Sequence, residues 1–170
     1  MGDSQHVSEQ SLAASLSGVE TTPLALDLLY NEVDKLYHAY ARGCGLSDCA
    51  YWMLYDIERA GGELPLARLT ESWSYSKQTI NSALKVLQER GLIALTFMEG
   101  SRKSKLAAFT EEGRTFSAER IVPAIRAEER AFSSLTEQER SLLVQLVRRY
   151  IDALEQQILA CTPEDRKSVV

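Results

Sequence analysis

The stretch SKQTINSALKVLQERGLI, Ser76–Ile93, predicts a helix with two different faces. Its apolar residues repeat at the three- and four-residue spacing of an amphipathic helix that packs on a core. They are Ile80, Ala83, Leu84 and Leu87. Ser76 is a suitable N-cap, and Gly91 is suitable for the end of the helix. We therefore expect a helix over residues 77–90 that buries one stripe.

The opposite side of this helix is polar. At 100° per residue it carries one cation and no carboxylate: Gln78, Asn81, Ser82 and Lys85. Asn and Gln side chains can pair with adenine edges in the major groove, and Lys can reach guanine or phosphate. Lys77 and the free amides of the first turn favour phosphate contacts. The pattern by itself leaves DNA readout and an ordinary solvated face both open.

The neighbouring segments predict a helix-turn-helix followed by a wing. Ser47 can cap a helix that runs to Arg59, and Pro65 can open a short helix over Leu66–Trp73. Residues 92–97 and 105–109 are typical of a two-stranded hairpin. Its turn, Gly100–Lys105, contains three cations, and an Arg at a hairpin tip can enter a narrow minor groove. A basic hairpin alone is more often ordinary surface, but in this position it indicates a wing.

Long amphipathic helices flank this central piece. The first begins at Thr22-Pro23 and ends near Arg42. The next runs over residues 111–132 and can kink at Pro123. Thr136 and Glu139 form a capping-box pattern for a last helix that reaches about residue 160. The fold class is mainly α with a small β-hairpin wing, a winged helix-turn-helix between long dimerisation helices.

The expected domain organisation follows from these elements. We assign residues 1–22 to a flexible N-terminal arm, 23–45 and 111–162 to a helical dimerisation region, 46–110 to the winged helix-turn-helix lobe, and 163–170 to a tail. The outer helices carry more apolar surface than the lobe alone can cover, which predicts an obligate homodimer. The apolar positions are Leu26, Leu29, Val33, Leu36, Leu143, Val147, Tyr150, Leu154 and Ile158.

Charge is unevenly distributed along the 170 residues. The net charge is −5, but residues 64–109 contain seven basic and three acidic side chains, a balance of +4 that leaves −9 elsewhere. Such a basic patch is expected of a protein that holds phosphate with one surface, although chance clustering is the alternative. An odd count of three cysteines, no membrane-length apolar run and no secretory signal predict a cytoplasmic protein without membrane contact.

The sequence resembles the MarR family of winged-helix regulators over Leu24–Ala160. Four stretches carry the resemblance: GLSDCAYWMLYDI (45–57), LARLTESWSYSKQTINSALKVLQERGLI (66–93), the wing, and FTEEGRTF (109–116). The resemblance implies a triangular homodimer with two recognition helices in successive major grooves of a pseudo-palindromic operator. It also implies, as in many members, release of DNA by a small phenolic or other amphipathic ligand.

We predict a sequence-specific regulator of double-stranded DNA, a repressor released by a small-molecule effector. The DNA-contacting residues are expected to be Ser76, Lys77, Gln78, Thr79, Asn81, Ser82, Lys85, Arg102, Lys103 and Lys105. Glu99 precedes Arg102 by three residues in a short loop, whereas the family often has a spacing of two. Which of Arg102 and Lys103 enters the minor groove therefore stays open.

Several residues of the sequence allow alternative or additional functions. Tyr37, Trp52 and Tyr55 can line a pocket for a small aromatic effector, although aromatic residues at helical spacing are more often core. Inert packing is favoured over peroxide sensing for the cysteines, and surface roles over metal binding for the histidines. No catalytic motif or cofactor site is present in the sequence, so we expect no enzyme. The main alternative is a winged helix for protein–protein contact, which would need an apolar recognition face.

Overall fold

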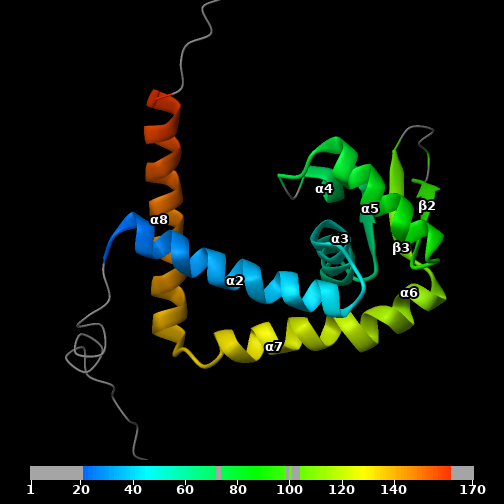
Figure 1. Cartoon of the computed structure of the whole chain (residues 1–170), viewed down its shortest axis with the longest axis horizontal. Coiled ribbons are helices and arrows are strands. Elements are labelled where there is room, and N and C mark those ends of the chain that lie inside the picture. Colours follow the sequence, from blue (N-terminus) through cyan, green and yellow to red (C-terminus); the bar gives the residue numbers. More distant parts are fainter. Residues whose placement is uncertain (1–20, 72–73, 99, 101–103, 162–170) are drawn as a thin grey trace, which may run out of the picture.

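The computed structural model describes residues 21–71, 74–98, 100 and 104–161. A winged-helix lobe lies at one end of the molecule, and the last helix, α8 (Glu137–Cys161), stands at the other (Figure 1). Helix α2 (Pro23–Gly43) extends from the lobe toward α8. The first turns of α2 and Tyr150 of α8 border the same surface hollow. The described part of the chain contains no helix that is long and apolar enough to cross a membrane.

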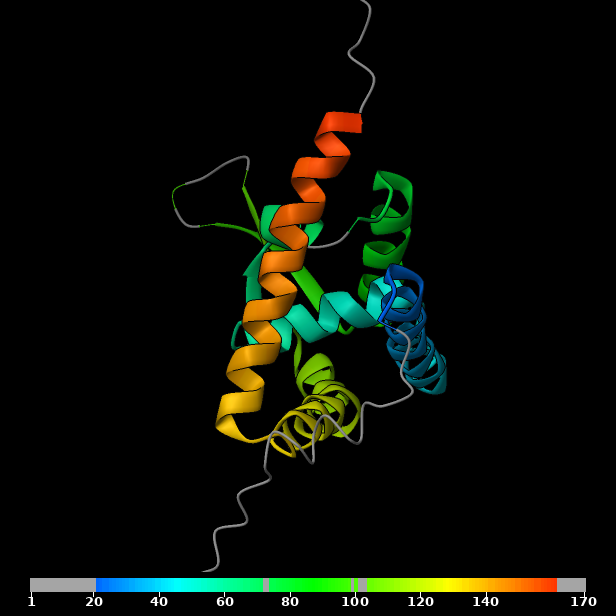
Figure 2. The ribbon, with the colours of Figure 1, turned by 90° about the vertical axis from the view of Figure 1, so that its left-hand side faces the viewer.

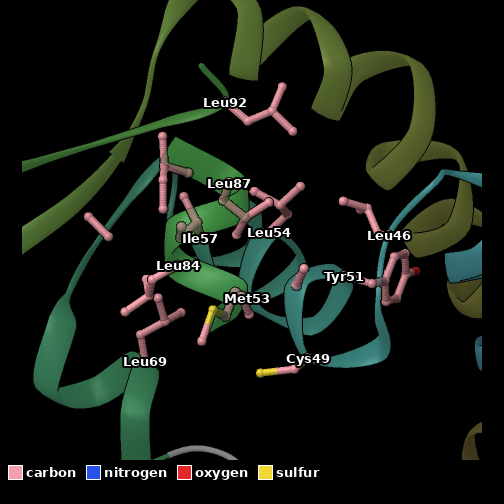
Figure 3. Packing of buried hydrophobic residues seen from close by; sticks show 14 of the residues in the cluster. Leu46, Cys49, Tyr51, Met53, Leu54, Ile57, Leu69, Leu84, Leu87 and Leu92 are labelled. Atoms are coloured by element: carbon pink, nitrogen blue, oxygen red, sulfur yellow. The ribbon is translucent and has the colours of Figure 1, made fainter. Parts of the chain in front are cut away.

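The core of the lobe forms between α3 (Asp48–Arg59) and α5 (Lys77–Glu89), with the short α4 (Leu66–Glu71) beside them. The apolar stripe predicted for α5 is confirmed, because all four of its residues are buried. Leu54 and Ile57 of α3 meet Leu87 of α5 in the centre of this core (Figure 3). Both helices begin as predicted, with the hydroxyls of Ser47 and Ser76 accepting backbone N–H bonds.

The sheet has three strands rather than the two that the sequence predicts. Strands β2 (Ile93–Phe97) and β3 (Lys105–Phe109) form the expected hairpin, and β1 (Glu63–Pro65) adds to the other side of β3 in antiparallel register. The sequence predicts that Pro65 opens a helix, but it ends this strand, and α4 begins one residue later. A proline is tolerated on such an edge strand because its missing N–H breaks no interior ladder. Three residues are too few to show alternation in sequence.

The predicted helix over residues 111–132 is interrupted by a π-helical turn. It consists of α6 (Glu111–Phe116), the π-helix Ser117–Ile121, and α7 (Val122–Phe132). The N–H of Val122 bonds to the carbonyl of Ser117, five residues back, immediately before Pro123. Two side chains from other helices bond to this turn. The buried Ser117 hydroxyl donates to Glu58 at 2.6 Å, and the Tyr40 hydroxyl donates to the Arg120 carbonyl at 2.8 Å.

Helix α8 begins with the predicted capping box. A carboxylate oxygen of Glu139 accepts bonds from the backbone N–H and the hydroxyl of Thr136, at 2.7 and 2.8 Å. These bonds to the ionised form lower the pKa of Glu139. Figure 2 shows α8 as one long helix in front of the lobe. No residue of α8 is buried, and its apolar side chains are exposed along much of its length. Within the described residues, most apolar side chains of α8 are therefore left largely uncovered by the single chain.

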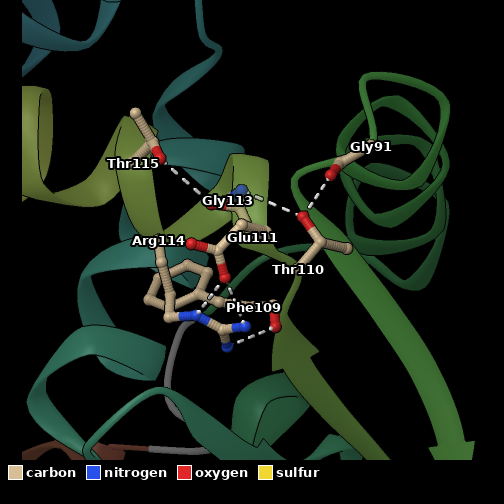
Figure 4. A network of polar contacts seen from close by, with 7 residues as sticks. All are labelled: Gly91, Phe109, Thr110, Glu111, Gly113, Arg114 and Thr115. Carbon is tan, nitrogen blue, oxygen red and sulfur yellow. Dashed lines mark hydrogen bonds and ion pairs between the residues drawn. The ribbon is translucent and has the colours of Figure 1, made fainter.

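The segment FTEEG, residues 109–113, joins the sheet to α6 and holds it against the end of α5 (Figure 4). The Thr110 hydroxyl donates to the carbonyl of Gly91 and accepts the N–H of Gly113 at 2.9 Å. Gly91 adopts the left-handed conformation, φ +66°, that ends α5. A Cβ on Gly113 would lie 1.8 Å from the carbonyl oxygen of Leu92, so only glycine fits there.

We expect Gly113→Ala to lower the free energy of unfolding by about 3 kcal/mol or more, because the added methyl group has to displace backbone. Gly43→Ala is the matched control, since Gly43 is helical and its Cβ would meet nothing within 4 Å. That substitution should change stability by less than about 1 kcal/mol. Urea titration followed by circular dichroism measures both. Equal stabilities of the two variants would contradict the close packing at Gly113.

Candidate nucleic-acid interface

The exposed side of α5 consists of the residues that the sequence places opposite the core. Gln78, Asn81, Ser82 and Lys85 are all exposed, as are Ser76, Lys77 and Thr79 at the start of the helix. The hydroxyls of Ser76 and Thr79 lie 2.8 Å apart, and Ser76 accepts the N–H of Thr79 at 3.1 Å. These two residues therefore shape the helix start. The longer side chains behind them are available for contacts with a ligand.

One carboxylate that was not predicted borders this exposed side. Glu89 lies four residues after Lys85, and its Oε1 is 3.7 Å from the Lys85 ammonium group. Both side chains are exposed, so the ion pair contributes little to stability and does not prevent Lys85 from meeting phosphate. The i,i+4 spacing of the two residues could have revealed this contact. The first turns of α5 contain no acidic residue.

The strands of the wing lie beside the winged-helix core, at the same end of the molecule as α5 and away from α8 (Figure 1). Arg102 and Lys103, predicted to contact DNA, lie outside the described residues. Lys105 begins β3 opposite Phe97 of β2, and its ammonium group is 5.9 Å from the Phe97 ring centroid. Both side chains are exposed. Lys105 thus presents a cation at the base of the wing.

The predicted aromatic residues fall into a core and a cavity wall. Tyr51 is fully buried, and its hydroxyl has no hydrogen-bond partner within the described chain. The ring centroids of Tyr37 and Trp52 lie 4.6 Å apart, and both side chains border a cavity of about 720 Å³ between α2 and α3. Tyr55 packs against Trp52 but is not part of the cavity lining, and its hydroxyl donates to Glu128 of α7. Burial and the Glu128 carboxylate raise the pKa of Tyr37 to about 12.

The cavity lining also contains residues that were not among the predicted pocket residues. Ser74 and Tyr75 line it from the segment that leads into α5, and further residues of α2 complete it. The α2 residues are Leu28, Asn31, Glu32, Asp34, Lys35 and His38. Their spacing of three and four residues could have identified one face of α2. The segment around Ser74 is far from α2 in sequence, so no spacing could have predicted that contact.

A sequence model of the MarR family matches residues 45–104, which span α3 to the turn of the wing. This segment is a MarR-family domain. The match covers 60 of the 170 residues and agrees with the resemblance found in the sequence. No curated protein matches the sequence.

Solved structures of MarR-family regulators have the same fold as the chain. A MarR family regulator from Neisseria meningitidis is 21% identical with a TM-score of 0.68, and the match covers 81% of this chain and 96% of that one. A MarR family transcriptional regulator from Listeria monocytogenes, complexed with 26mer DNA, is 18% identical with a TM-score of 0.63, covering 88% and 99%. PcaV from Streptomyces coelicolor, in complex with its natural ligand, is 20% identical with a TM-score of 0.56, covering 79% and 94%.

The cysteines and His38 have ordinary structural surroundings. Burial raises the pKa of the Cys44 and Cys49 thiols, which disfavours the reactive thiolate. The imidazole Nδ1 of His38 lies 2.9 Å from the Asp48 carboxylate. The described residues contain no group of three or more His, Cys, Asp or Glu side chains that could hold a metal ion. Inert packing thus remains the interpretation for Cys44 and Cys49.

We expect iodoacetamide to alkylate Cys161, exposed at the end of α8, several-fold faster than Cys44 or Cys49 in the folded protein. A raised pKa means that the two slower thiols ionise only as the pH climbs through that higher value, so their rates should increase steeply under alkaline conditions. Mass spectrometry of peptides after timed labelling measures this. In urea the three rates should converge. Fast labelling of Cys44 or Cys49 at neutral pH would instead indicate an activated thiol.

Proposed function

We propose that the protein binds a pseudo-palindromic double-stranded operator as a homodimer and reads bases with α5. The observation that carries this proposal is the exposed side of α5, where Gln78, Asn81 and Ser82 are polar, uncharged and free of carboxylate neighbours in the first turns. Opposite them, the buried stripe holds α5 rigidly on the core. A rigid helix with amide side chains outward fits the major groove.

Base reading and phosphate holding are assigned to different residues. The amides of Gln78 and Asn81 can each form two hydrogen bonds with an adenine edge. Lys77 lies at the positive N-terminal end of the α5 dipole, where phosphate is favoured. The wing adds Arg102, Lys103 and Lys105 as contacts to phosphate or the minor groove. The Listeria regulator complexed with 26mer DNA supports DNA as the partner of this fold.

The homodimer is proposed from apolar surface that the single chain leaves uncovered. Six of the nine apolar side chains predicted for the interface are each at least 43% exposed: Leu29, Val33, Leu36, Leu143, Leu154 and Ile158. Single exposed leucines are normal, but so many on two helices mark an interface. We assign residues 23–45 and 111–162 to the dimerisation region and 46–110 to the DNA-binding lobe. The expected dimer buries more than about 2,000 Å² in total.

We further propose that the protein is a repressor that a small aromatic effector releases from DNA. The cavity beside Tyr37 and Trp52 lies between α2 and the lobe, where an effector can favour one arrangement of the two. PcaV has been solved in complex with its natural ligand, which supports ligand binding by this fold. An effector can shift DNA affinity only by the ratio of its affinities for the two arrangements.

Replacing Asn81 with Ala should separate the reading of bases from the binding of phosphate. In a dimer the substitution affects both half-sites, so we expect a loss of about 1 to 3 kcal/mol per half-site on the operator and little loss on random DNA. Folding should be unchanged because Asn81 is exposed. Fluorescence anisotropy with an operator selected from genomic fragments measures both affinities. Equal losses on operator and random DNA would exclude base reading by this residue.

Lys105→Gln is the companion variant, since it keeps most of the side chain and removes only the charge. We expect it to weaken binding to operator and random DNA alike. The slope of log affinity against log salt should become shallower by about 0.9 for each phosphate that the protein no longer neutralises. Salt titrations of both DNAs measure the slope. A weaker affinity for the operator alone would mean that Lys105 reads bases.

The double variant Leu143→Glu/Leu154→Glu should abolish the dimer, because it places two carboxylates in the proposed interface. The lobe should stay folded, since both side chains are exposed in the single chain and lie on α8. Gln156→Glu, at another exposed position of α8, is the control and should leave the dimer intact. Analytical ultracentrifugation measures the mass. A dimeric double variant would show that α8 does not form the interface.

A further inference from the structure

The cavity between α2 and the lobe is large enough for a small organic molecule. Its volume of about 720 Å³ lies within the range of ligand pockets in proteins. Tyr37 and Trp52 line it, their ring centroids 4.6 Å apart and the ring planes tilted by 49°. Tyr75 lines it as well, from the segment before α5. Three aromatic side chains thus line the cavity.

Charged residues of the cavity lining are predominantly acidic. The lining contains the carboxylates of Glu32, Asp34 and Asp48 but only one permanently charged cation, Lys35. Its formal charge is therefore −2 when His38 is neutral and −1 when His38 is protonated. Asp48 is paired with His38, whereas Glu32 and Asp34 form no ion pair among the described residues. The lining keeps its negative sign in either protonation state of His38.

The environment of Tyr75 supports this sign. Its pKa is raised, first by burial and then by the negative charges of Cys49, Asp48 and Asp34 in their ionised forms. The aspartates thus contribute negative potential at the hydroxyl of Tyr75, a residue of the cavity lining. A carboxylate ligand would meet like charge there. An ammonium group would be attracted by the carboxylates and by the ring faces, which have a negative quadrupole.

We propose that this cavity binds a small aromatic amine in its cationic form and discriminates against aromatic carboxylates. The proposal rests on the effector site of the proposed function and specifies the charge of its ligand. The aromatic part packs between Tyr37, Trp52 and Tyr75, and the ammonium group faces Glu32 and Asp34. Ser74 and Tyr75 directly precede Ser76, the N-cap of α5, so an occupied cavity acts on the start of the helix that faces DNA.

Three probes with the same ring and similar length test the charge preference: 2-phenylethylamine, 2-phenylethanol and 3-phenylpropanoate. Isothermal titration calorimetry with the protein of residues 1–170 and no DNA gives their affinities. We expect the amine to bind about tenfold or more tighter than the carboxylate, with the alcohol between them. Equal or tighter binding of the carboxylate overturns the proposal. The absence of detectable binding of all three probes also overturns the proposal.

The double variant Glu32→Gln/Asp34→Asn tests whether these carboxylates set the preference. Both side chains are exposed, so we expect each to contribute about two- to fivefold to the affinity for the amine. The affinity for the neutral alcohol should stay the same, which shows that the cavity has kept its shape. Glu63→Gln removes an exposed carboxylate from β1, outside the cavity lining, and is the matched control. An unchanged preference for the amine in the double variant overturns the proposal.

Operator affinity measured with and without the amine separates this inference from the proposed function. If the amine binds with the expected charge dependence and also weakens the operator complex, both the charge inference and the proposed effector role are supported. Binding of the amine without any change in operator affinity supports the charge assignment and removes the effector role. Loss of base reading in the Asn81→Ala experiment would leave the calorimetric comparison of the probes unaffected, because that comparison uses no DNA. Equal losses on operator and random DNA would refute the reading assignment alone.

Discussion

The packing of α3 against α5 is the contact on which the rest of the lobe depends. Leu54 and Ile57 of α3 and Leu87 of α5 have no measurable exposure, and each such side chain contributes about 1.5 to 3 kcal/mol by burial. Because the apolar stripe of α5 faces inward, the side-chain amides of Gln78 and Asn81 must face outward. The orientation of the proposed reading residues is therefore a consequence of hydrophobic burial. A polar substitution in the apolar stripe would disturb both the core packing and the orientation of the reading residues.

A second set of contacts connects the lobe to the long helices. Thr110 bonds to the end of α5 and to the start of α6, and Gly113 lets the two backbones approach closely. One turn further on, Ser117 and Arg120 of the π-helix bond to α3 and α2. π-helical turns of this kind are frequent at functional sites. Here the turn joins the part that is proposed to face DNA to the helices that are proposed to form the dimer, so their relative position depends on a few polar contacts.

Charge and apolar surface are segregated over the molecule in a way that suits several partners. Lys77 and Lys85 of α5 and Lys105 of β3 are exposed, carboxylates line the cavity, and leucines remain exposed on α2 and α8. Each surface is proposed to bind a different partner: phosphate and base edges, a small cation, and a second copy of the chain. The net charge of −5 conceals the uneven distribution, because the −9 of the remaining residues outweighs the +4 of residues 64–109.

Local sequence patterns determined the helices, the caps and the two faces of α5, because these depend on residues within a few positions of one another. Ser47, Ser76 and Thr136 cap helices as predicted, and Ile80 and Leu87 are buried as predicted. The tertiary structure alone decided the rest. Strand β1 exists because β3, more than 40 residues later, offers it an edge. The π-turn depends on bonds from α2 and α3, and the cavity forms where Tyr37 and Trp52 meet Tyr75. Such contacts join residues far apart in the chain, and burial and pairing select them only after the helices have packed.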